Sequence, residues 1–371
     1  MKMKVIIIGS SIAGAAMALA LSDYAKVLVY EQKKEEDVSK KVCGNICTSS
    51  IEKYANELGL EEDFILSRYN KLKIFSKQNE AEFPTNEYEI DRRKLLREIV
   101  GKARKNSVQF NFHTRFSGFE RKNGKFIVHL ESARNKFEEN ADILIGADGA
   151  LSEVAKSAGL FGKREFFLFL QTKVNAASIK NKALIPDKNS YNIFVGKNYG
   201  YYSYIFPSRD GKELKIGLGD DSDKDVSTMF SLFMEKLGTK KGKIEGALVP
   251  KPKVIRGRKN FFLIGDASCN LKYTGGGIVP DMEQVLALRD RILKKGNSRL
   301  ESERRKLVLN RRITRMVQKM GDRDFDILLE ILKKPRFKNA FSFRDDLGKG
   351  DIMKMLSPEL IWTGLRIALR H

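Results

Sequence analysis

The sequence predicts an α/β protein in which a domain built on a parallel sheet is interleaved with a domain built on an antiparallel sheet. Residues 4–21 contain a β-branched strand, a glycine-rich turn and an Ala-rich helix. Residues 141–149 and 261–268 each contain another apolar strand that ends in a Gly/Asp turn, and residues 166–220 between them are rich in strands. Because the strand–turn units flank that β-rich stretch, each domain is expected to consist of separate pieces of chain.

The individual elements follow from the hydrophobic period and from turn residues. Leu95, Leu96 and Ile99 have the spacing of a buried helix face, and Asn123-Gly124 is typical of a two-residue hairpin turn. Asp210-Gly211 predicts a second turn. In chain order, strands are expected at residues 4–8, 26–30, 71–75, 80–83 and 108–112, in a hairpin at 116–131, and at 141–146, 166–174, 191–195, 201–207, 213–219 and 261–264, with helices at 12–21, 50–58, within 89–103 and from about 281 onward.

Composition sets the class of protein. The 371 residues are enough for two domains, and 42% hydrophobic with 31% charged residues is typical of a globular protein. The formal net charge of +22 predicts an anionic partner or surface, or the Lys/Arg-rich surface of a thermophile. An odd set of three cysteines argues against a secreted disulfide framework, and no run reaches the ~18 apolar residues of a membrane span. We therefore expect a cytoplasmic protein.

The first turn carries a phosphate-binding pattern. A strand that enters a Gly-rich turn and a helix presents backbone N–H groups and the positive helix end to a phosphate. Gly9 and Gly14 occupy the outer positions of Gly-x-Gly-x-x-Gly, whereas Ser11 occupies the middle one, where its small hydroxymethyl group is expected to be tolerated. Glu31 and the following Gln32 stand where an acidic residue binds ribose hydroxyls. The predicted pyrophosphate contacts are Gly9, Ser11, Ile12, Ala13 and Gly14. A plain strand and helix without a ligand is the alternative.

Two later motifs extend this pattern. Asp148 lies between glycines in "IGADGALSEVAK", and Asp266 lies in "LIGDAS", which is followed by "TGGGI". Together with the first turn, these motifs resemble the three fingerprints of FAD-dependent proteins of the para-hydroxybenzoate-hydroxylase-type fold. The resemblance implies a Rossmann-like FAD-binding domain in which Asp266 contacts the ribityl chain and Asp148 supports the pyrophosphate region. It also implies that Gly265, Gly276, Gly277 and Ile278 lie at the flavin.

Two further segments narrow the family. "KKVCGNICTSS" and "YGYYSYIFP" resemble the Pro-x-x-Cys-Gly and Tyr-x-Trp-x-Phe-Pro segments of the geranylgeranyl reductase family, with Lys40 in place of Pro and Tyr204 in place of Trp. Arg92 in "IDRRKL" matches a basic residue of that family near the cofactor, and the resemblance covers about residues 1–293. It implies a reductase that uses reduced FAD to saturate isolated C=C bonds of polyprenyl chains on lipids or prenylquinones. Because the sequence has no second nucleotide-binding unit, an external donor is expected, either ferredoxin or NAD(P)H.

The resemblance also implies the catalytic residues, which are Cys43, Gly44, Tyr202, Tyr204 and Phe206. Cys43 is expected either to donate a proton or gate the pocket at the flavin, or to be a small buried hydrophobic residue. Aromatic residues alternate along residues 166–171 and 201–207, which we expect to be adjacent strands, and they line a tunnel or fill the sheet core. Cys269 could form a redox pair with Cys43 or Cys47. The three histidines show no metal-ligand spacing, so no metal is expected.

The C-terminal part is basic and helical. Residues 289–319 contain twelve Lys/Arg against three Asp/Glu. An apolar stripe runs through Leu309, Ile313, Met316, Val317 and Met320, and a second one includes Leu360, Ile361, Trp362 and Leu365. Such helices predict either contact with an anionic membrane surface or a core stripe with a solvated basic face. Nucleic acid is not expected because no nucleic-acid-binding motif accompanies the charge.

These inferences divide the chain into three regions. The FAD-binding domain is expected at residues 1–70, 91–160 and 255–295, the substrate-binding β-sheet domain at 71–90 and 161–254, and a basic helical region at 296–371. A cytoplasmic location, peripheral on the inner face of the membrane, fits a lipid substrate. The alternatives are an FAD-dependent aromatic hydroxylase or monooxygenase, which shares the three fingerprints, and a flavin-free prenyl-lipid carrier, which Ser11 motivates.

Overall fold

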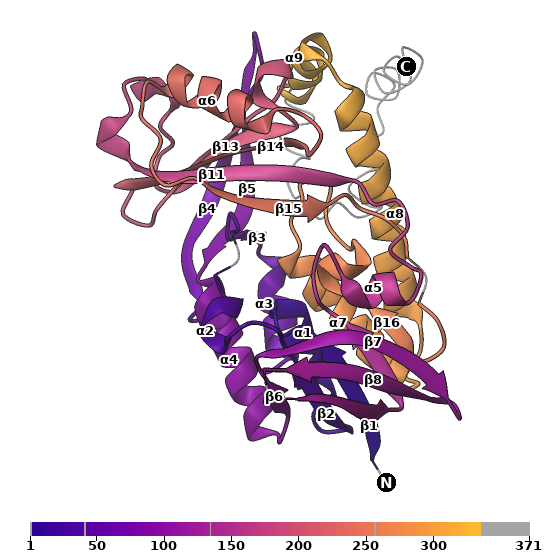
Figure 1. The fold of residues 1–371 in the computed structure, drawn as a ribbon. Coiled ribbons are helices and arrows are strands. Elements are labelled where there is room, and N and C mark those ends of the chain that lie inside the picture. Colours follow the sequence, from indigo (N-terminus) through magenta and orange to yellow (C-terminus); the bar gives the residue numbers. More distant parts are fainter. Residues whose placement is uncertain (1, 41, 134, 256, 335–371) are drawn as a thin grey trace.

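The computed structural model describes residues 2–40, 42–133, 135–255 and 257–334 (Figure 1). Its lower part in Figure 1 is built around a five-stranded sheet and its upper part around an eight-stranded sheet, and helix α8 runs along one side from one part to the other. The second C-terminal motif, from Leu360 to Leu365, lies outside the described residues. The mixture of a parallel sheet, an antiparallel sheet and C-terminal helices confirms the predicted fold class.

The five-stranded sheet is entirely parallel and is buried on both faces. Its order is β16-β10-β1-β2-β6, with β1 (Met3–Ile8), β2 (Ala25–Tyr30), β6 (Gln109–Asn111), β10 (Ile143–Gly146) and β16 (Phe261–Leu263). Val5 and Ile7 of β1 pack with the helices α1 (Ile12–Leu21), α3 (Ser50–Glu57), α4 (Arg92–Lys105) and α7 (Ile278–Ile292). Ile6 and Ile8 point to the opposite face, which a three-stranded sheet covers. Segments from both sides of the β-rich stretch therefore meet in one sheet.

The three-stranded sheet consists of β7 (Thr114–Lys122), β8 (Lys125–Ser132) and β9 (Lys136–Ala141). Asn123 and Gly124 connect β7 to β8 with φ angles of 49° and 78°. Two positive φ values are what a type I′ hairpin turn requires, so the predicted hairpin is confirmed. The sheet packs through Phe116, Phe126 and Val128 against the parallel sheet.

The eight-stranded sheet has the order β15-β11-β14-β13-β12-β4-β5-β3. Its strands are β3 (Ile46–Thr48), β4 (Ile65–Phe75), β5 (Glu80–Ile90), β11 (Phe166–Asn175), β12 (Ser190–Phe194), β13 (Tyr202–Pro207), β14 (Glu213–Asp221) and β15 (Glu245–Pro250). All neighbours are antiparallel except β12 and β4, which run parallel. Helix α6 (Val226–Leu237) packs on one face, and α9 (Asp322–Leu332) packs on the other.

Two strands are longer than predicted. β4 begins at Ile65 rather than residue 71, and β5 continues through Pro84 to Ile90 rather than ending at residue 83. A register shift between Tyr69 and Lys71 of β4 lies next to the proline, and such irregularities allow a residue without an N–H to stay in a strand. β3, within the predicted segment 1–70, pairs with β5 in the larger sheet; the division into domains itself stays a prediction.

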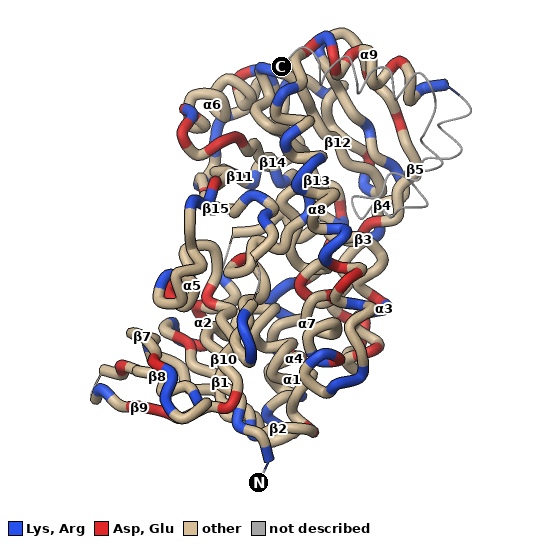
Figure 2. The backbone as a smooth tube through the Cα atoms, turned by 90° about the vertical axis from the view of Figure 1, so that its right-hand side faces the viewer, with Lys and Arg blue, Asp and Glu red and all other residues tan. Residues whose placement is uncertain are grey.

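The remaining helices complete the two parts. They are the short α2 (Glu35–Val38) and α5 (Glu153–Ser157), and the long α8 (Ser298–Lys319), which packs on α7. Lys and Arg recur along α8 in Figure 2, in agreement with its predicted basic character. Within the ranges that the structure describes, no helix combines the length and the apolar composition that crossing a membrane requires.

Candidate functional site

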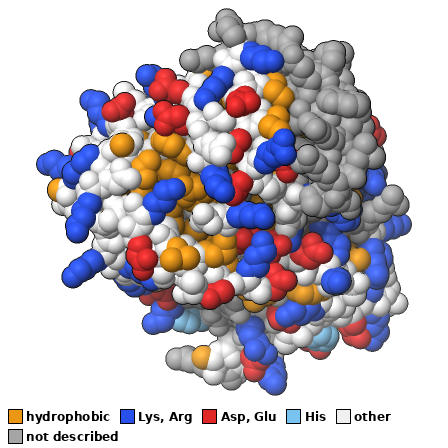
Figure 3. Space-filling model, turned by 90° about the horizontal axis from the view of Figure 1, so that it is seen from above, with side chains coloured by type: hydrophobic (Ala, Val, Ile, Leu, Met, Phe, Trp, Pro, Cys, Tyr) orange, Lys and Arg blue, Asp and Glu red, His pale blue; other side chains and the backbone are white. Residues whose placement is uncertain are grey.

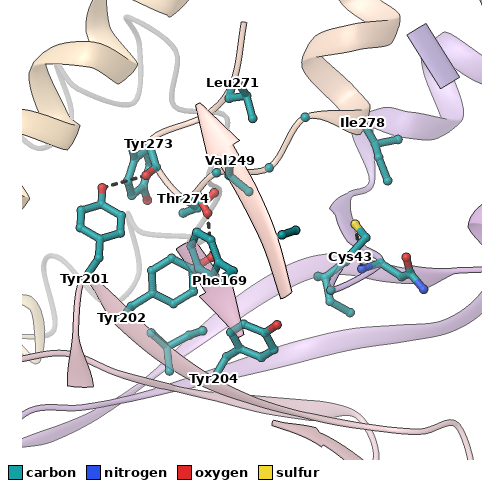
Figure 4. A pocket seen from close by; sticks show the side chains of 18 of the residues that line it. Cys43, Phe169, Tyr201, Tyr202, Tyr204, Val249, Leu271, Tyr273, Thr274 and Ile278 are labelled. Carbon is teal, nitrogen blue, oxygen red and sulfur yellow. Dashed lines mark hydrogen bonds between the residues drawn. The ribbon is translucent and has the colours of Figure 1, made fainter. Parts of the chain in front are cut away.

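A cavity of about 640 Å³, here called the apolar cavity, lies where the two sheets and helices α8 and α9 meet. Its lining comes from the first glycine turn, from residues 42–46, from one face of the eight-stranded sheet, from residues 271–278 and from both C-terminal helices. Figure 4 shows Tyr202, Tyr204 and Phe169 on one side of it, with Cys43 and Ile278 farther along. Segments that are hundreds of residues apart in sequence therefore share this site.

The first turn presents the N-terminus of α1 to the cavity. Ser11, Ile12 and Ala13 line the cavity, and the Ser11 side chain does not cap the helix. Instead, the buried Arg92 donates from Nη2 to Ser11 Oγ at 3.0 Å, and from Nη1 to the Ser39 carbonyl at 3.3 Å. The first N–H groups of α1 therefore have no side-chain acceptor at Ser11, and they lie beside a guanidinium group, an arrangement that suits an anion.

Gly9 and Gly14 shape this turn without lining the cavity. Gly9 has a φ of +101°, and a Cβ atom on it would lie 2.3 Å from the Ala147 carbonyl oxygen. A Cβ atom on Gly14 would lie 2.0 Å from the carbonyl oxygen of Gly9. Since real Cβ atoms do not come so close to backbone atoms, both positions require glycine. The two outer glycines thus hold the turn against β10.

Glu31 and Asp148 also lie beside the cavity rather than in its lining. The buried Glu31 carboxylate, at the carboxyl end of β2, accepts from the backbone N–H groups of Ser10 and Lys33, each at 2.9 Å, and Gln32 next to it is exposed. Asp148 accepts from Ser152 Oγ at 2.5 Å and from the Val154 N–H at 3.0 Å.

These contacts give Asp148 a supporting position. Burial raises the pKa of its carboxyl group, while the hydrogen bonds from Ser152 and Val154 oppose that rise. Its side chain accepts from the first turn of α5, whose N-cap is Ser152, and its neighbours Ala147 and Gly149 line the cavity.

The turn at Asp266 is anchored from both parts of the molecule. Gly265, Asp266, Gly276, Gly277 and Ile278 all line the cavity. A Cβ atom on Gly265 would lie 2.9 Å from the Cβ of Ala13, so this turn packs closely on the first turn.

The loop between them is held by the eight-stranded sheet. The hydroxyl groups of Tyr201 and Tyr202 donate to the carbonyl oxygens of Tyr273 and Thr274, each at 2.7 Å (Figure 4). The tyrosines at the start of β13 therefore fix residues 273–278 relative to the first turn.

One face of the eight-stranded sheet forms an aromatic floor. Tyr202, Tyr204 and Phe206 of β13 line the cavity, as does Phe169 of β11. The prediction that β11 and β13 are adjacent is wrong, because β14 lies between them. Gly217 and Gly219 of β14 carry no side chain on this face; Cβ atoms there would lie 2.1 Å from the Tyr204 ring and 2.2 Å from the Phe169 ring.

The rings consequently meet over the glycine strand. The centroids of Phe169 and Tyr202 are 5.3 Å apart, and Tyr204 and Phe206 stack at 4.5 Å. Tyr204 donates to Gln171 Oε1 at 3.0 Å, and its burial raises the pKa of the phenol. A buried phenol with its proton held in this way stays neutral, so the floor is uncharged at Tyr204.

Helices α8 and α9 form the opposite, apolar wall. The residues of the predicted stripe, Leu309, Ile313, Met316, Val317 and Met320, all line the cavity, together with Phe325, Leu328, Leu329 and Leu332 of α9. The first stripe thus faces the cavity, with Met320 buried and Met316 40% exposed, which agrees in part with the second of its two predicted interpretations, a core stripe with a solvated basic face.

Residues 42–46 form the loop that separates the floor from the first turn. Cys43 is half-buried, and its Sγ accepts from the Asn45 N–H at 3.4 Å. A Cβ atom on Gly44 would lie 3.4 Å from Cε2 of Phe206, and the Gly44 carbonyl oxygen accepts from Nζ of Lys215 at 2.7 Å. Lys215 is buried and also lies 3.6 Å from Glu89 Oε1.

Sequence reasoning missed Lys215. Its place in an alternating strand predicts an ordinary solvent-facing lysine, and only the pairing of β14 between β11 and β13 brings it to the Cys43 loop.

The three cysteines are free thiols in this structure, so the predicted redox pair stays a prediction. Cys47 and Cys269 are buried, and burial raises the pKa of Cys269 to about 11. A thiol with so high a pKa is mostly protonated at neutral pH and therefore a poor nucleophile. Among the described residues, no cluster of His, Cys, Asp or Glu could hold a metal ion.

The residues present fit FAD. The N-terminus of α1 and Arg92 suit the pyrophosphate, and Glu31 is an acceptor at the end of β2, where a ribose would bind. The glycines of residues 275–277 leave room beside Cys43 and Ile278, where a flat ring could lie. Most of the predicted cofactor residues line or adjoin the cavity, whereas Gln32 is exposed. The predicted catalytic residues Tyr202, Tyr204 and Phe206 belong to its floor, while Cys43 lies farther along, toward Ile278 (Figure 4).

Comparisons with known proteins agree with this geometry. A family model described as "FAD binding domain" matches residues 2–224. The geranylgeranyl diphosphate reductase of Oryza sativa chloroplasts is 25% identical over 314 residues, which cover 75% of this chain and 63% of that protein. The digeranylgeranylglycerophospholipid reductase of Methanocaldococcus jannaschii is 22% identical over 358 residues, which cover 88% of this chain and 90% of that protein.

Solved structures share the fold. A geranylgeranyl bacteriochlorophyll reductase-like protein from Thermoplasma acidophilum aligns with a TM-score of 0.80 at 19% identity, covering 99% of this chain and 98% of that one. The p-nitrophenol 4-monooxygenase PnpA of Pseudomonas putida aligns with a TM-score of 0.69 at 13% identity, covering 98% of each chain. The resemblance to geranylgeranyl reductases and the FAD prediction are thereby confirmed. The chain belongs to the FAD binding domain family, and its cofactor is FAD.

Proposed function

We propose that this flavoprotein is an FAD-dependent oxidoreductase of the geranylgeranyl reductase type, which saturates isolated C=C bonds of polyprenyl chains. The observation that carries this proposal is the apolar cavity, which extends from the FAD-binding turns to the apolar wall of α8 and α9. An aromatic floor and an aliphatic wall suit a long hydrocarbon chain. The similarity to proteins named as reductases of geranylgeranyl compounds supports the same substrate class.

The chemistry assigns roles to the residues of the cavity. A polyprenyl alkene has no carbonyl group to polarise, so the protein must contribute alignment and a positioned proton. Reduced FAD, when bound, supplies the hydride, and adding one hydride and one proton turns C=C into CH–CH. Tyr202, Tyr204 and Phe206 exclude water and orient the chain, while the thiol of Cys43 holds the proton at the cavity wall. The Gly44 backbone fixes the position of that thiol.

The partners follow from this reaction. The substrate is an isoprenoid lipid or a prenylquinone, and the electrons come from ferredoxin or NAD(P)H. A lipid substrate and the net charge of +22 favour a peripheral position on an anionic membrane surface on the cytoplasmic side.

The test is a reduction assay with the FAD-loaded protein. Dithionite-reduced protein is incubated with geranylgeranyl lipids, geranylgeranyl diphosphate and a prenylquinone, and products are analysed by mass spectrometry. We expect mass gains of two hydrogens per reduced bond, and Cys43→Ser should lower kcat at least tenfold. Cys47→Ala is the matched control, since Cys47 does not line the cavity, and it should stay within threefold of wild type.

Two results would contradict the proposal. Hydroxylation of an aromatic compound, with oxygen consumption coupled to NAD(P)H and no reduced prenyl product, would identify a monooxygenase. Absence of flavin absorbance in the purified protein, even after FAD is added, would identify a flavin-free prenyl-lipid carrier.

A further inference from the structure

A second cavity of about 530 Å³, here called the polar cavity, lies on the other side of the Cys43 loop. It shares Val42, Cys43, Asn45, Arg92 and Gln171 with the apolar cavity. Its other walls come from the end of β5 and the start of α4, from β11, from β14 and from residues 243–245. The two cavities therefore meet at the loop that carries Cys43.

The polarity of the sheet face changes where the cavities meet. Successive residues on one face of β11 are Phe169, Gln171 and Lys173, because side chains alternate along a strand. Gln171 pairs with Gly217, and Lys173 pairs with Lys215. Over five residues of β11, the face thus changes from an aromatic ring to a neutral amide and then to an ammonium group, next to which lies the ammonium group of Lys215 on β14. A ligand lying along this face would need an apolar body and an anionic end.

The polar cavity carries an excess of positive charge. Its lining contains six basic residues, Lys40, Arg92, Arg93, Lys173, Lys215 and Lys243, against three acidic ones, Glu89, Asp91 and Glu245. Asp91 is engaged in capping α4, where it accepts from the backbone N–H groups of Arg93 and Lys94. Glu89 accepts from Ser67 Oγ at 3.2 Å and lies near Lys215. Outside the lining, Lys173 pairs with Glu213 at 2.9 Å and Lys40 pairs with Asp37 at 2.5 Å. Among the residues that the structure describes, the positive charge without a close carboxylate therefore lies on Arg92, Arg93 and Lys243 and, in part, on Lys215.

Lys215 lies at the junction of the two cavities. Burial lowers the pKa of its ammonium group, whereas the nearby Glu89 and Cys43 oppose that decrease. Its Nζ donates to the Gly44 carbonyl oxygen, and its nearest carboxylate oxygen is 3.6 Å away. An ammonium group that is out of water and only loosely paired is stabilised by a further anion. Arg93 and Lys243 have no ion pair within the described part of the chain, and both line the same cavity.

We propose that the polar cavity binds a phosphate group at the end of the substrate, so that the prenyl chain enters the apolar cavity past Cys43. This inference rests on the proposed function, because it concerns the charged end of the same substrate. Lysine and arginine groups on several elements suit a phosphate or diphosphate, whose oxygens accept from several donors at once. The change of polarity along β11 places the boundary between head and chain at Gln171, next to the thiol.

The experiment compares two substrates that have the same prenyl chain and differ in the diphosphate group. The FAD-loaded protein, reduced with dithionite, is assayed with geranylgeranyl diphosphate and with geranylgeraniol. The variant Lys173→Gln/Lys243→Gln removes two exposed ammonium groups of the polar cavity. Lys26→Gln/Lys122→Gln is the control, since it removes the same charge from exposed positions on β2 and β7. Binding of inorganic pyrophosphate to the unreduced holoprotein is measured by calorimetry.

We expect the Lys173/Lys243 variant to lower the preference in kcat/KM for the diphosphate over the alcohol at least tenfold, and to weaken pyrophosphate binding at least tenfold. The control variant should change both by less than twofold. An unchanged preference together with unchanged pyrophosphate binding would overturn the proposal, even if both substrates are reduced.

Two other outcomes are informative. The first would show that the bound phosphate belongs to the electron donor, and the second would separate failure of the proposed reductase function from failure of the phosphate site. If the variant impairs only NADPH-driven turnover and not dithionite-driven turnover, the phosphate belongs to the nicotinamide donor, and the substrate assignment is overturned. The wild-type protein could instead bind pyrophosphate, with weaker binding in the Lys173/Lys243 variant, and yet reduce neither compound. That result would support the phosphate site and contradict the reductase function.

Discussion

Gly14 shows how a single missing side chain shapes the first glycine turn. It lies in the first turn of α1, where a Cβ atom would lie 2.0 Å from the carbonyl oxygen of Gly9 and 3.1 Å from the Cβ of Ala147. Neither neighbour can move easily, because both belong to the packed turns at the ends of β1 and β10. Ser11 in the same turn has ordinary extended geometry and a hydrogen-bond partner in Arg92. The middle position of the motif therefore tolerates a side chain, whereas Gly14 does not.

The first prediction follows from that difference. Gly14→Ala should destabilise the protein by about 3 kcal/mol, the upper end of the usual cost of overpacking, and should weaken FAD binding because the turn must shift. The measurement is urea unfolding combined with fluorescence titration of FAD. Gly101→Ala is the matched control, since no atom lies within 4 Å of a Cβ there and the residue lies in the middle of α4. It should stabilise the protein by roughly 0.5–1 kcal/mol; equal effects of the two variants would refute the packing argument.

At the scale of elements, a chain of buried hydrogen bonds joins α8 to the Asp266 turn. Glu303 of α8 accepts from Gln284 Nε2 of α7 at 3.5 Å. Gln284 Oε1 in turn accepts from the Gly265 N–H at 2.9 Å and from Ser268 Oγ at 3.2 Å. Burial, followed by repulsion from Glu283, raises the pKa of Glu303 from 4.5 to about 7. The helix that walls the apolar cavity is thus linked through α7 to the Asp266 turn, which lines the same cavity.

This link predicts a pH dependence of stability. Between pH 4.5 and pH 7, the folded protein keeps a proton on Glu303 that the unfolded chain has lost, so the free energy of unfolding falls as pH rises through this range. The fall attributable to Glu303 is about 3 kcal/mol at 1.36 kcal/mol per pKa unit. Glu303→Gln should remove that fall and make the protein more stable than wild type at pH 8. Unfolding curves from pH 4.5 to 8 measure it, with Glu301→Gln, an exposed position on the same helix, as control. If the free energy of unfolding falls equally with pH in Glu303→Gln and in wild type, protonation of Glu303 is not the cause of the fall.

Elements that depend on local sequence could be predicted, whereas the order in which the strands pair within a sheet could not. Asn123-Gly124 defines its hairpin because only those two residues must adopt positive φ. By contrast, nothing in residues 166–219 tells which strands pair. β14 lies between β11 and β13 because Gly217 and Gly219 leave space for the rings of its neighbours, a complementarity that appears only when three strands are together.

The candidate site likewise has a part that could be predicted from short motifs and a part that could not. Its glycine turns and Cys43 lie in motifs that are readable as short segments, and those segments indeed surround the cavity. Lys215 and the wall formed by α9 depend on contacts between distant parts of the chain. The amphipathic stripe of α8 was visible in the sequence, but its period is the same whether the apolar face meets a membrane or a sheet.

At the scale of the whole molecule, positive charge is spread over the surface while the first apolar stripe faces the apolar cavity. In the view from above, hydrophobic side chains gather in one area that is bordered by charged ones (Figure 3). The net charge of +22 provides a long-range attraction to anionic lipid that requires no inserted helix. Attraction of this kind is screened by salt, over about 10 Å at 0.1 M and about 3 Å at 1 M.

The prediction at this scale concerns vesicle binding. In flotation experiments at low salt, the protein should be recovered with vesicles that contain anionic phospholipid and not with neutral ones. Raising the salt to 1 M should release it, because the described apolar stripe faces the apolar cavity. Equal recovery with neutral and anionic vesicles would contradict an electrostatic attachment, and retention at 1 M salt would indicate insertion of apolar residues.

The position of the cavity wall in the chain affects how the protein is made. The aromatic floor lies within residues 169–206, whereas α8 and α9, which cover it, begin only at Ser298. During synthesis on the ribosome, the floor therefore emerges more than ninety residues before its cover. An uncovered aromatic sheet face is prone to associate with other nascent chains. Chaperone assistance, or slow translation between these regions, would have its greatest effect on yield in this interval.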